Sequence, residues 1–205
     1  MRVRYLFSGI VVLVAFMLIS TLAISDEIEN LILGGDFEDQ ADLSKWSINN
    51  WESSSVVEID PENFVTGEAC LYFSITTTSG WDPRPCQDNF MVKKGDTYTF
   101  SVFLKADAPY ALLPRVHVSG TWELFMEKQV TVQTEWAEYW VTGSPMNDMT
   151  VQISICNTGG IMNYWADTAM FYEGEYVPTE LDGADQQVAA AGKLSTTWAG
   201  IKALH

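Results

Sequence analysis

The sequence predicts an all-β domain, a two-sheet jelly-roll β-sandwich, preceded by a signal peptide and followed by a short linker and tail. Several stretches alternate apolar and polar side chains with the period of two that marks a half-buried strand. Turn pairs such as Gly34-Gly35, Ser79-Gly80 and Lys94-Gly95 separate these stretches. The central region shows no long amphipathic helical pattern. Many short strands at this spacing are typical of a sandwich or jelly roll.

Residues 1–25 are predicted to be a secretory signal peptide. Arg2 and Arg4 precede the apolar run 10–19, and residues 23–25 supply small side chains at a cleavage point. An uncleaved anchor is the alternative, because residues 5–24 are long enough to span a bilayer at ~1.5 Å per residue. Polar and small residues within the segment favour cleavage. We therefore expect a secreted or periplasmic protein with no stable membrane insertion.

The charge of the chain excludes some classes of partner. The chain has 11 basic and 27 acidic residues, a net charge of −16. Removing Arg2 and Arg4 with the signal peptide leaves 9 − 27 = −18. Such a surface repels nucleic acid and anionic lipid. It suits an exported protein whose partner is neutral, cationic or a calcium ion.

Residues 26–178 form the predicted domain, which is long enough for one hydrophobic core. Apolar Tyr98, Phe100, Val102 and Leu104 give the clearest alternation, in the expected strand 97–105. The other expected strands are 31–33, 54–59, 69–76, 115–119, 129–132, 136–142 and 151–156.

The character of the chain changes after Pro178. Residues 179–192 are acidic and then Ala-rich, which is typical of a linker. In the tail 193–205, Leu194, Trp198 and Ile201 have helical spacing. This spacing predicts a short helix against the domain, with docking to a protein partner as the alternative.

The three cysteines, Cys70, Cys86 and Cys156, are predicted to enter an oxidising compartment. Their spacing fits no zinc site. Cys70 and Cys86 flank the Ser79-Gly80 turn at similar distances, so an antiparallel hairpin would set them opposite each other. They are the predicted disulfide pair, with three free thiols as the alternative.

Six motifs in order resemble a known family. They are Asn30-Leu-Ile-Leu-Gly-Gly-Asp-Phe-Glu38, Trp46, Thr66-Gly-Glu-Ala-Cys-Leu71, Trp81-Asp-Pro-Arg-Pro-Cys-Gln87 with the following 94–106 block, Trp136-Ala-Glu-Tyr139, and Tyr164-Trp-Ala-Asp-Thr-Ala-Met-Phe171. This series resembles the CenC-like carbohydrate-binding modules of the family 4/9 type over about Asn30 to Pro178. The resemblance implies a secreted, non-catalytic module that binds β-glycan chains, polysaccharide or oligosaccharide, in a groove on one sheet face.

The resemblance also implies a structural calcium ion where the first strands meet the last. Its ligands would be the carboxylates of Glu38 and Asp167 with main-chain oxygens of Asp36 and Gly67. Calcium takes ~6–8 oxygen ligands at ~2.3–2.6 Å. The ion would explain a lone aspartate in an apolar and aromatic strand. The family usually has Asp-Asp where this chain has Asp167-Thr168.

Strand alternation indicates which side chains face the groove. If the core receives Val116, Val118, Val151, Ile153 and Ile155, the opposite face receives Arg115, His117, Ser119, Gln152 and Ser154. Trp81 is the favoured aromatic platform. The predicted carbohydrate-binding residues are Trp81, Arg84, Gln87, Arg115, His117, Trp122 and Gln152. A buried structural role is the alternative for Gln87, and Trp46, Trp136 and Trp165 are assigned to the core.

The sequence favours a binding domain over an enzyme. Glu58-Ile-Asp-Pro-Glu62 resembles an acidic motif of jelly-roll endoglucanases, but Glu58 and Glu62 would lie roughly 13 Å apart in a regular strand. Retaining hydrolysis needs carboxyl groups ~5–5.5 Å apart. His117 and His205 are isolated, and no Gly-x-Ser-x-Gly elbow is present. The alternatives are a calcium-stabilised structural or adhesive sandwich without sugar binding and a small jelly-roll glycosidase.

Overall fold

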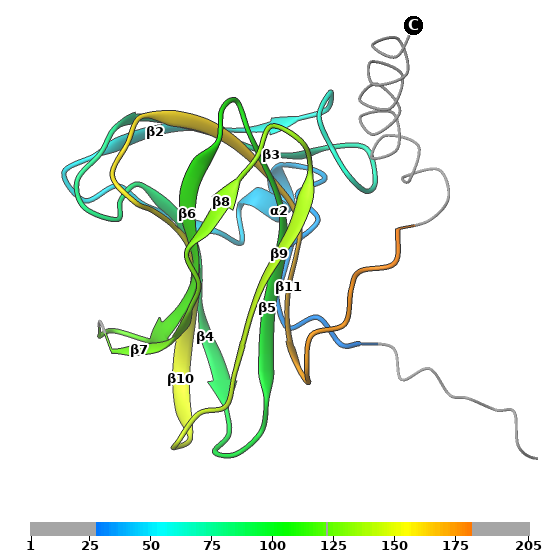
Figure 1. The fold of residues 1–205 in the computed structure, drawn as a ribbon, viewed down its shortest axis with the longest axis vertical. Coiled ribbons are helices and arrows are strands. Elements are labelled where there is room, and N and C mark those ends of the chain that lie inside the picture. The colour runs from blue at the N-terminus through cyan, green and yellow to red at the C-terminus, as the bar shows by residue number, and fades with distance from the viewer. Residues whose placement is uncertain (1–27, 122, 182–205) are drawn as a thin grey trace, which may run out of the picture.

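The structure is a computed structural model that describes residues 28–121 and 123–181. The predicted signal peptide and the predicted tail lie outside the described residues, as does Trp122. Two antiparallel sheets face each other as a β-sandwich (Figure 1). The prediction of a two-sheet all-β sandwich is confirmed. None of the helices within 28–121 and 123–181 is long and apolar enough to cross a membrane.

In the described part of the chain, the larger sheet has the order β1-β4-β10-β6-β7, with β8 also paired to β6. Its strands are β1 (Ser47–Asn49), β4 (Arg84–Val92), β10 (Met149–Asn157), β6 (Tyr110–Val118), β7 (Leu124–Glu127) and β8 (Val130–Val132). We call it the six-stranded sheet. A short helix, α2 (Gln40–Leu43), precedes β1, and the Asp39 carboxylate caps it by accepting from the amides of Ala41 and Asp42.

The second sheet, the five-stranded sheet, has the order β2-β3-β11-β5-β9 over the described residues. Its strands are β2 (Ser54–Asp60), β3 (Cys70–Thr77), β11 (Met162–Glu173), β5 (Tyr98–Ala106) and β9 (Ala137–Gly143).

The core lies between the two sheets and is built from alternate residues of the strands. Val151, Ile153 and Ile155 of β10 are completely buried. Phe171 of β11 lies across the core from them and contacts Phe90 of β4 edge-on at 5.3 Å between ring centroids. Burying each such side chain contributes about 1.5–3 kcal/mol relative to exposure. The predicted alternation is therefore confirmed for β10.

The strand β4 was not expected, because Pro83 and Pro85 interrupt the pattern. In the structure Pro85 stands opposite Ile48 of the short edge strand β1. The registered pairing of β4 with the central strand β10 begins at Cys86, opposite Ser154. Pro85 has no N–H to donate, but it precedes the first registered pair between β4 and β10, so no hydrogen bond of those pairs is lost. Proline is tolerated in sheets at such positions.

The predicted strand at 31–33 is wrong. The Leu31 amide donates to the Phe171 carbonyl at 2.8 Å, in the five-stranded sheet. The Leu33 amide instead donates to Oε1 of Gln87, in the six-stranded sheet, at 3.0 Å. Residues 31–33 form no β-ladder, because they bond to β11 in one sheet and to β4 in the other. The segment therefore connects the two sheets at one edge of the sandwich.

The predicted Cys70–Cys86 disulfide is also wrong. Cys70 begins β3 in the five-stranded sheet, whereas Cys86 lies in β4 of the six-stranded sheet. The chain crosses between the sheets at residues 78–83 instead of forming a hairpin. All three cysteines are free and buried.

We expect none of the three thiols to react with a thiol reagent at pH 8 in the native protein, and all three to react in urea. Burial blocks access and raises the pKa of Cys86 to about 11 and the pKa values of Cys70 and Cys156 as well. Mass spectrometry of the alkylated protein counts the labelled thiols. A mass lower than that of the reduced chain by two hydrogens would reveal a disulfide and contradict the structure.

Candidate functional site

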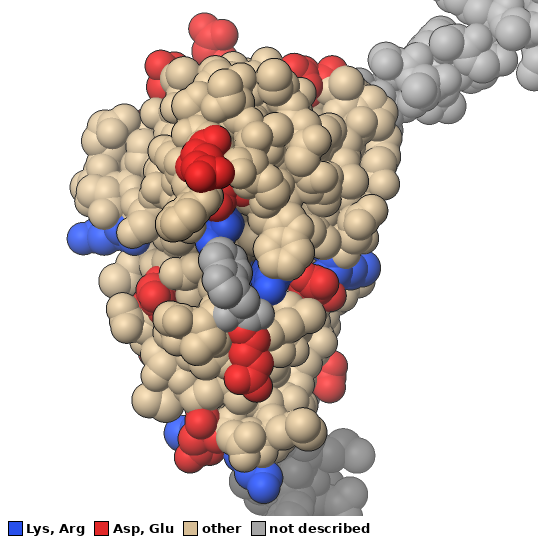
Figure 2. Space-filling model, turned by 90° about the vertical axis from the view of Figure 1, so that its left-hand side faces the viewer, with Lys and Arg blue, Asp and Glu red and all other residues tan. Residues whose placement is uncertain are grey.

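The outer face of the six-stranded sheet carries the predicted polar side chains in rows across three strands. Cys86 of β4, Ser154 of β10 and Arg115 of β6 share one row, because Ser154 is the register partner of both others. Gln152 and His117 share the next row. Figure 2 shows basic side chains in the middle of this side of the molecule, with acidic side chains around them. We call this face the groove face.

Two buried guanidinium groups lie on the groove face. Arg84 is 2% exposed and forms an ion pair with the Asp82 carboxylate. Arg115 is 3% exposed, and its Nη1 lies 3.4 Å from Oε2 of Glu127. Beyond Arg2 and Arg4, these are the only arginines in the sequence. Because each guanidinium has a carboxylate beside it, these charges are balanced locally.

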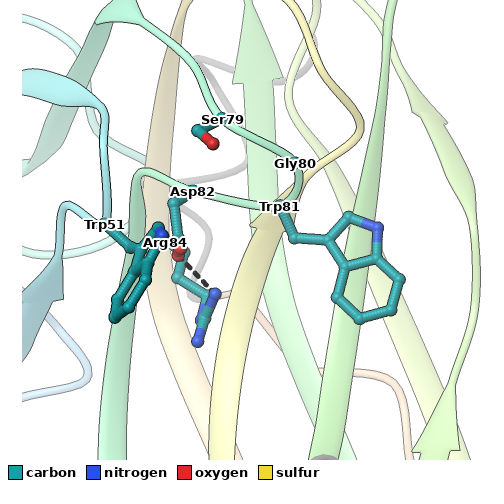
Figure 3. A pocket seen from close by; sticks show the side chains of 6 residues that line it. All are labelled: Trp51, Ser79, Gly80, Trp81, Asp82 and Arg84. Atoms are coloured by element: carbon teal, nitrogen blue, oxygen red, sulfur yellow. Dashed lines mark hydrogen bonds and ion pairs between the residues drawn. The ribbon is translucent and has the colours of Figure 1, made fainter.

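Two exposed tryptophans flank a pocket at one end of the groove face. Trp81 is 43% exposed and Trp51 is 69% exposed, although both are large apolar side chains. In Figure 3 they project on opposite sides of the Asp82–Arg84 ion pair. The pocket between them has a volume of about 450 Å³, and Ser79 and Gly80 complete its lining. The exposed aromatic surface on both sides makes this pocket the candidate binding site.

Trp81 also packs against a side chain of the groove face. The guanidinium carbon of Arg115 lies 4.2 Å from the centre of the Trp81 ring, a cation–π contact. Trp51 follows β1 and was missed in the sequence analysis. The signal available for it was a tryptophan in the polar stretch Asn49-Asn-Trp-Glu-Ser53, where a core residue is not expected.

A second polar group lies further along β4. The exposed Asp88 carboxylate accepts a hydrogen bond from Gln152 Nε2 at 3.3 Å and one from the Ser119 hydroxyl. Asp88 was missed as well, because β4 was not predicted. The structure thus brings Trp81, Arg84, Arg115, His117 and Gln152 to the groove face, as the sequence analysis expected.

Gln87 is not on the groove face. Its register partner is Ile153, which is completely buried in the core. Its Oε1 accepts from the Leu33 amide at 3.0 Å, and its Nε2 donates to the Leu33 carbonyl at 2.9 Å and the Lys45 carbonyl at 3.3 Å. Gln87 therefore holds the N-terminal segment, and its placement among the sugar-binding residues is corrected.

Asp167 is completely buried in β11, and main-chain amides surround its carboxylate. Its Oδ2 accepts from the amides of Val65 at 2.7 Å and Thr66 at 3.1 Å, and its Oδ1 accepts from the amide of Thr168 at 2.6 Å. Burial nevertheless raises the pKa of Asp167 to about 6, because it disfavours the charged form more than these bonds favour it.

The second predicted carboxylate ligand, Glu38, reaches the same loop. Its Oε2 accepts from the Glu68 amide at 2.8 Å, and a Cβ at Gly67 would overlap this carboxylate. Glu38 and Asp167 both lie near Cys70 and help to raise the pKa of its thiol. Among the described residues no group of three or more His, Cys, Asp or Glu side chains could hold a metal ion. A cation here would therefore need main-chain oxygens such as those of Asp36 and Gly67.

The acidic motif at 58–62 lies far from the groove face in the topology. Glu58 is an exposed residue of β2, the edge strand of the five-stranded sheet. Asp60 accepts a hydrogen bond from Nε1 of Trp165 at 2.7 Å and from the Glu62 amide at 2.8 Å. These bonds tie Asp60, the last residue of β2, to Trp165 of β11 and to the loop that follows β2.

Comparison with known proteins places the chain among carbohydrate-binding folds. Residues 29–158 match the family model of a carbohydrate binding domain, CBM 4/9. A solved CBM4 domain is similar over 70% of this chain and 99% of its own, with 22% identity and a TM-score of 0.56. The CBM22-1 xylan-binding domain of Paenibacillus barcinonensis Xyn10C is similar over 70% and 94%, with 16% identity and a TM-score of 0.55.

The same fold also occurs in an enzyme. The Stig cyclase Fisc of Fischerella sp. TAU is similar over 73% of this chain and 99% of its own, with 12% identity and a TM-score of 0.54. A comparison with curated protein sequences gives no significant match. At these identities the solved structures establish the fold alone.

We expect His117 to make the folded domain less stable as the pH falls from about 6.5 to about 4. Burial and the charges of Arg115 and Arg84 lower the pKa of His117 to about 4 from its ordinary value of 6.5, with Asp88 opposing them. Between these two pKa values His117 is protonated in the unfolded chain but not in the folded chain. The His117 contribution therefore lowers the free energy of unfolding by at most about 1.4 kcal/mol for each unit by which the pH falls.

Urea denaturation at several pH values measures this dependence. Asp167, whose pKa is raised to about 6, contributes to the slope with the opposite sign. His117→Gln should remove only the His117 contribution, so that the variant loses less stability than the wild type as the pH falls through this window. His205→Gln, the matched change at the other histidine, should leave the wild-type slope intact. Equal slopes for wild type and His117→Gln would contradict the assignment.

Proposed function

The chain belongs to the carbohydrate binding domain family, because more than half of it matches the family model, and on this premise we propose its specific activity. We propose a secreted, non-catalytic module that binds neutral β-glycan chains on the groove face. The observation that carries the proposal is the pocket between Trp51 and Trp81, with the Asp82–Arg84 ion pair at its base.

The two tryptophans suit a sugar chain because their indole faces can stack on the apolar faces of pyranose rings. A pocket walled on two sides fits a single chain better than a flat crystalline surface. Asp88, Gln152 and Ser119 lie further along the face and offer donors and acceptors for hydroxyl groups. This combination of aromatic walls and a few placed polar groups is usual for ligand sites.

The charges of the groove face favour an uncharged glycan. Arg84 and Arg115 are each balanced by a neighbouring carboxylate, Asp82 and Glu127 respectively. The lowered pKa of His117 keeps its ring neutral at pH 7, and Asp88 adds one further negative charge. An acidic sugar would meet these carboxylates, so a neutral sugar is the better complement.

The same pairing supports a non-catalytic role. Asp82 is engaged by Arg84, Glu127 lies beside Arg115, and Glu58 belongs to the other sheet. General acid–base hydrolysis requires two carboxyl groups that flank the bond to be cleaved.

The expected affinity for a glycan is micromolar to millimolar, because hydrogen bonds in a water-exposed site contribute only ~0.5–1.5 kcal/mol each.

Trp81→Ala should weaken glycan binding by about tenfold or more, since the loss of one stacking wall costs at least ~1.4 kcal/mol. Trp51→Ala should act in the same direction. Both side chains are substantially exposed, so the melting temperature should change little. Calorimetric titration with soluble β-glycan oligosaccharides, chosen by a glycan array, measures the affinity.

Glu58→Gln is the control and should change neither affinity nor stability. Reducing-sugar release by the wild type that is lost in Glu58→Gln would favour the glycosidase instead. A folded protein that binds no glycan on the array would favour the structural or adhesive sandwich.

We further propose that calcium binds between the carboxylates of Glu38 and Asp167, with main-chain oxygens of Asp36 and Gly67. The support is chemical. Within the described residues, neither carboxylate forms an ion pair with a lysine or arginine, and a buried carboxylate without a cation is costly. Calcium accepts such a mixture of carboxylate and carbonyl oxygens. The ion would join the N-terminal segment to the loop at 63–68 and to β11.

Calcium at ~100 times its dissociation constant should stabilise the wild type by ~2.7 kcal/mol, which is roughly 5–10 °C in melting temperature. Asp167→Asn should abolish this shift and the heat of calcium binding. Asp60→Asn, a change of the same kind at the end of β2, should retain both. A wild type that melts at the same temperature in calcium and in chelator would rule the ion out.

A further inference from the structure

We infer that Asn157 and Thr78 are positioning residues of the proposed glycan site. Together they fix the Trp81 loop, residues 78–82, so that the indole lies over the floor of the groove. The inference rests on the proposed function for its biological meaning. Its structural content, the placement of Trp81, can be measured without a ligand.

The Trp81 loop is closed by its own bonds, but these do not place it on the sheet. The Ser79 amide donates to the Asp82 carbonyl at 3.3 Å, and the Asp82 amide donates to the Ser79 carbonyl at 3.1 Å. The Thr78 hydroxyl donates to the same Asp82 carbonyl at 2.9 Å. Gly80 forms the tip with a φ of 58°, in the left-handed region that favours glycine. A loop shaped in this way could still tilt as a unit.

Asn157 prevents that tilt because it bonds to the loop on both sides of Trp81. It is the last residue of β10 and is completely buried. Its Nδ2 donates to Oγ1 of Thr78 at 2.7 Å and to the Asp82 carbonyl at 3.3 Å. Its main-chain amide donates to the carbonyl of Trp81 itself at 3.2 Å.

The other end of the Asn157 amide is held as firmly. Its Oδ1 accepts from the Tyr110 hydroxyl of β6 at 2.8 Å, from the Gly159 amide at 2.9 Å and from the Gly160 amide at 3.3 Å. The oxygen thus faces only donors, while the nitrogen donates to acceptors. This arrangement fixes the orientation of the amide, and with it the angle at which the loop leaves the sheet.

The anchor matters for binding because Trp81 must meet two partners at once. Arg115 supports one face of the indole at 4.2 Å, and the pocket toward Trp51 lies beside it. Dispersion contacts weaken sharply when a gap of even ~0.5–1 Å opens. A small tilt of the loop would therefore reduce stacking on a sugar without unfolding the domain.

Thr78→Val tests this role, because it keeps the side-chain shape but removes the hydroxyl that accepts from Asn157 and donates to the Asp82 carbonyl. We expect affinity for β-glycan oligosaccharide to fall about two- to twelvefold, a limited loss because the bonds from Asn157 to the Trp81 and Asp82 carbonyls remain. Thr78→Ser, which keeps the hydroxyl, should bind like the wild type. Thr99→Val is the matched control, since it also removes a buried threonine hydroxyl with two hydrogen bonds, to the Gly174 carbonyl at 2.8 Å and the Thr142 hydroxyl at 2.9 Å, but in the five-stranded sheet.

A double-mutant cycle separates positioning from general destabilisation. In a Trp81→Ala background, Thr78→Val should have no further effect on affinity, because there is no indole left to position. An equal loss in both backgrounds, or no loss in either, would overturn the inference while leaving the proposed function intact.

The free protein provides a second measurement that does not depend on glycan. The indole N–H resonance of Trp81, assigned from Trp81→Ala, should shift or broaden in Thr78→Val and in Asn157→Asp but not in Thr99→Val. An unchanged resonance would overturn the inference. A wild type that binds no glycan but shows the expected resonance changes would retain the positioning role and overturn only the proposed function.

Discussion

The structure depends on the alternation of side chains along β10, the strand between β4 and β6. Val151, Ile153 and Ile155 must all be apolar because they fill the core between the sheets. The residues between them then point to the opposite face whatever they are. Alternate positions of each strand therefore do not have to be apolar for the core to form. On β10 these positions include Gln152 and Ser154, which lie on the groove face.

The same constraint explains what a sequence can predict here. Arg115, His117 and Gln152 were placed on the groove face because β6 and β10 alternate regularly, and the register confirms this placement. Asp88 follows Arg84 and Cys86 with the same period of two, yet prolines hid the strand that carries them. An irregularity in the β4–β10 register lies at this point, because Ile153 pairs with Gln87 and Val151 with Phe90. Because prolines and a bulge interrupt the alternation, the sequence does not show which residues of this strand face the core and which face outward.

Other features could not be predicted because they depend on which sheet a segment joins. The Ser79-Gly80 turn has the composition of a hairpin turn, but the chain crosses there from one sheet to the other, which separates Cys70 from Cys86. Trp51 is exposed in a turn outside any alternating pattern. Local propensity specifies that a turn forms, whereas the packing of both sheets decides where the next strand goes.

The floor and the walls of the site are thus fixed by different means. The floor belongs to strands, whose ladders hold Arg115 and Ser154 in register. The walls, Trp51 and Trp81, come from connections between strands, which have no ladder of their own. A side chain in such a loop is positioned as firmly as one on a strand only if strand residues form hydrogen bonds to the loop. Asn157 ends the strand that carries the floor and directs its side-chain donors to the Trp81 loop, so the geometry of the wall follows from that of the sheet.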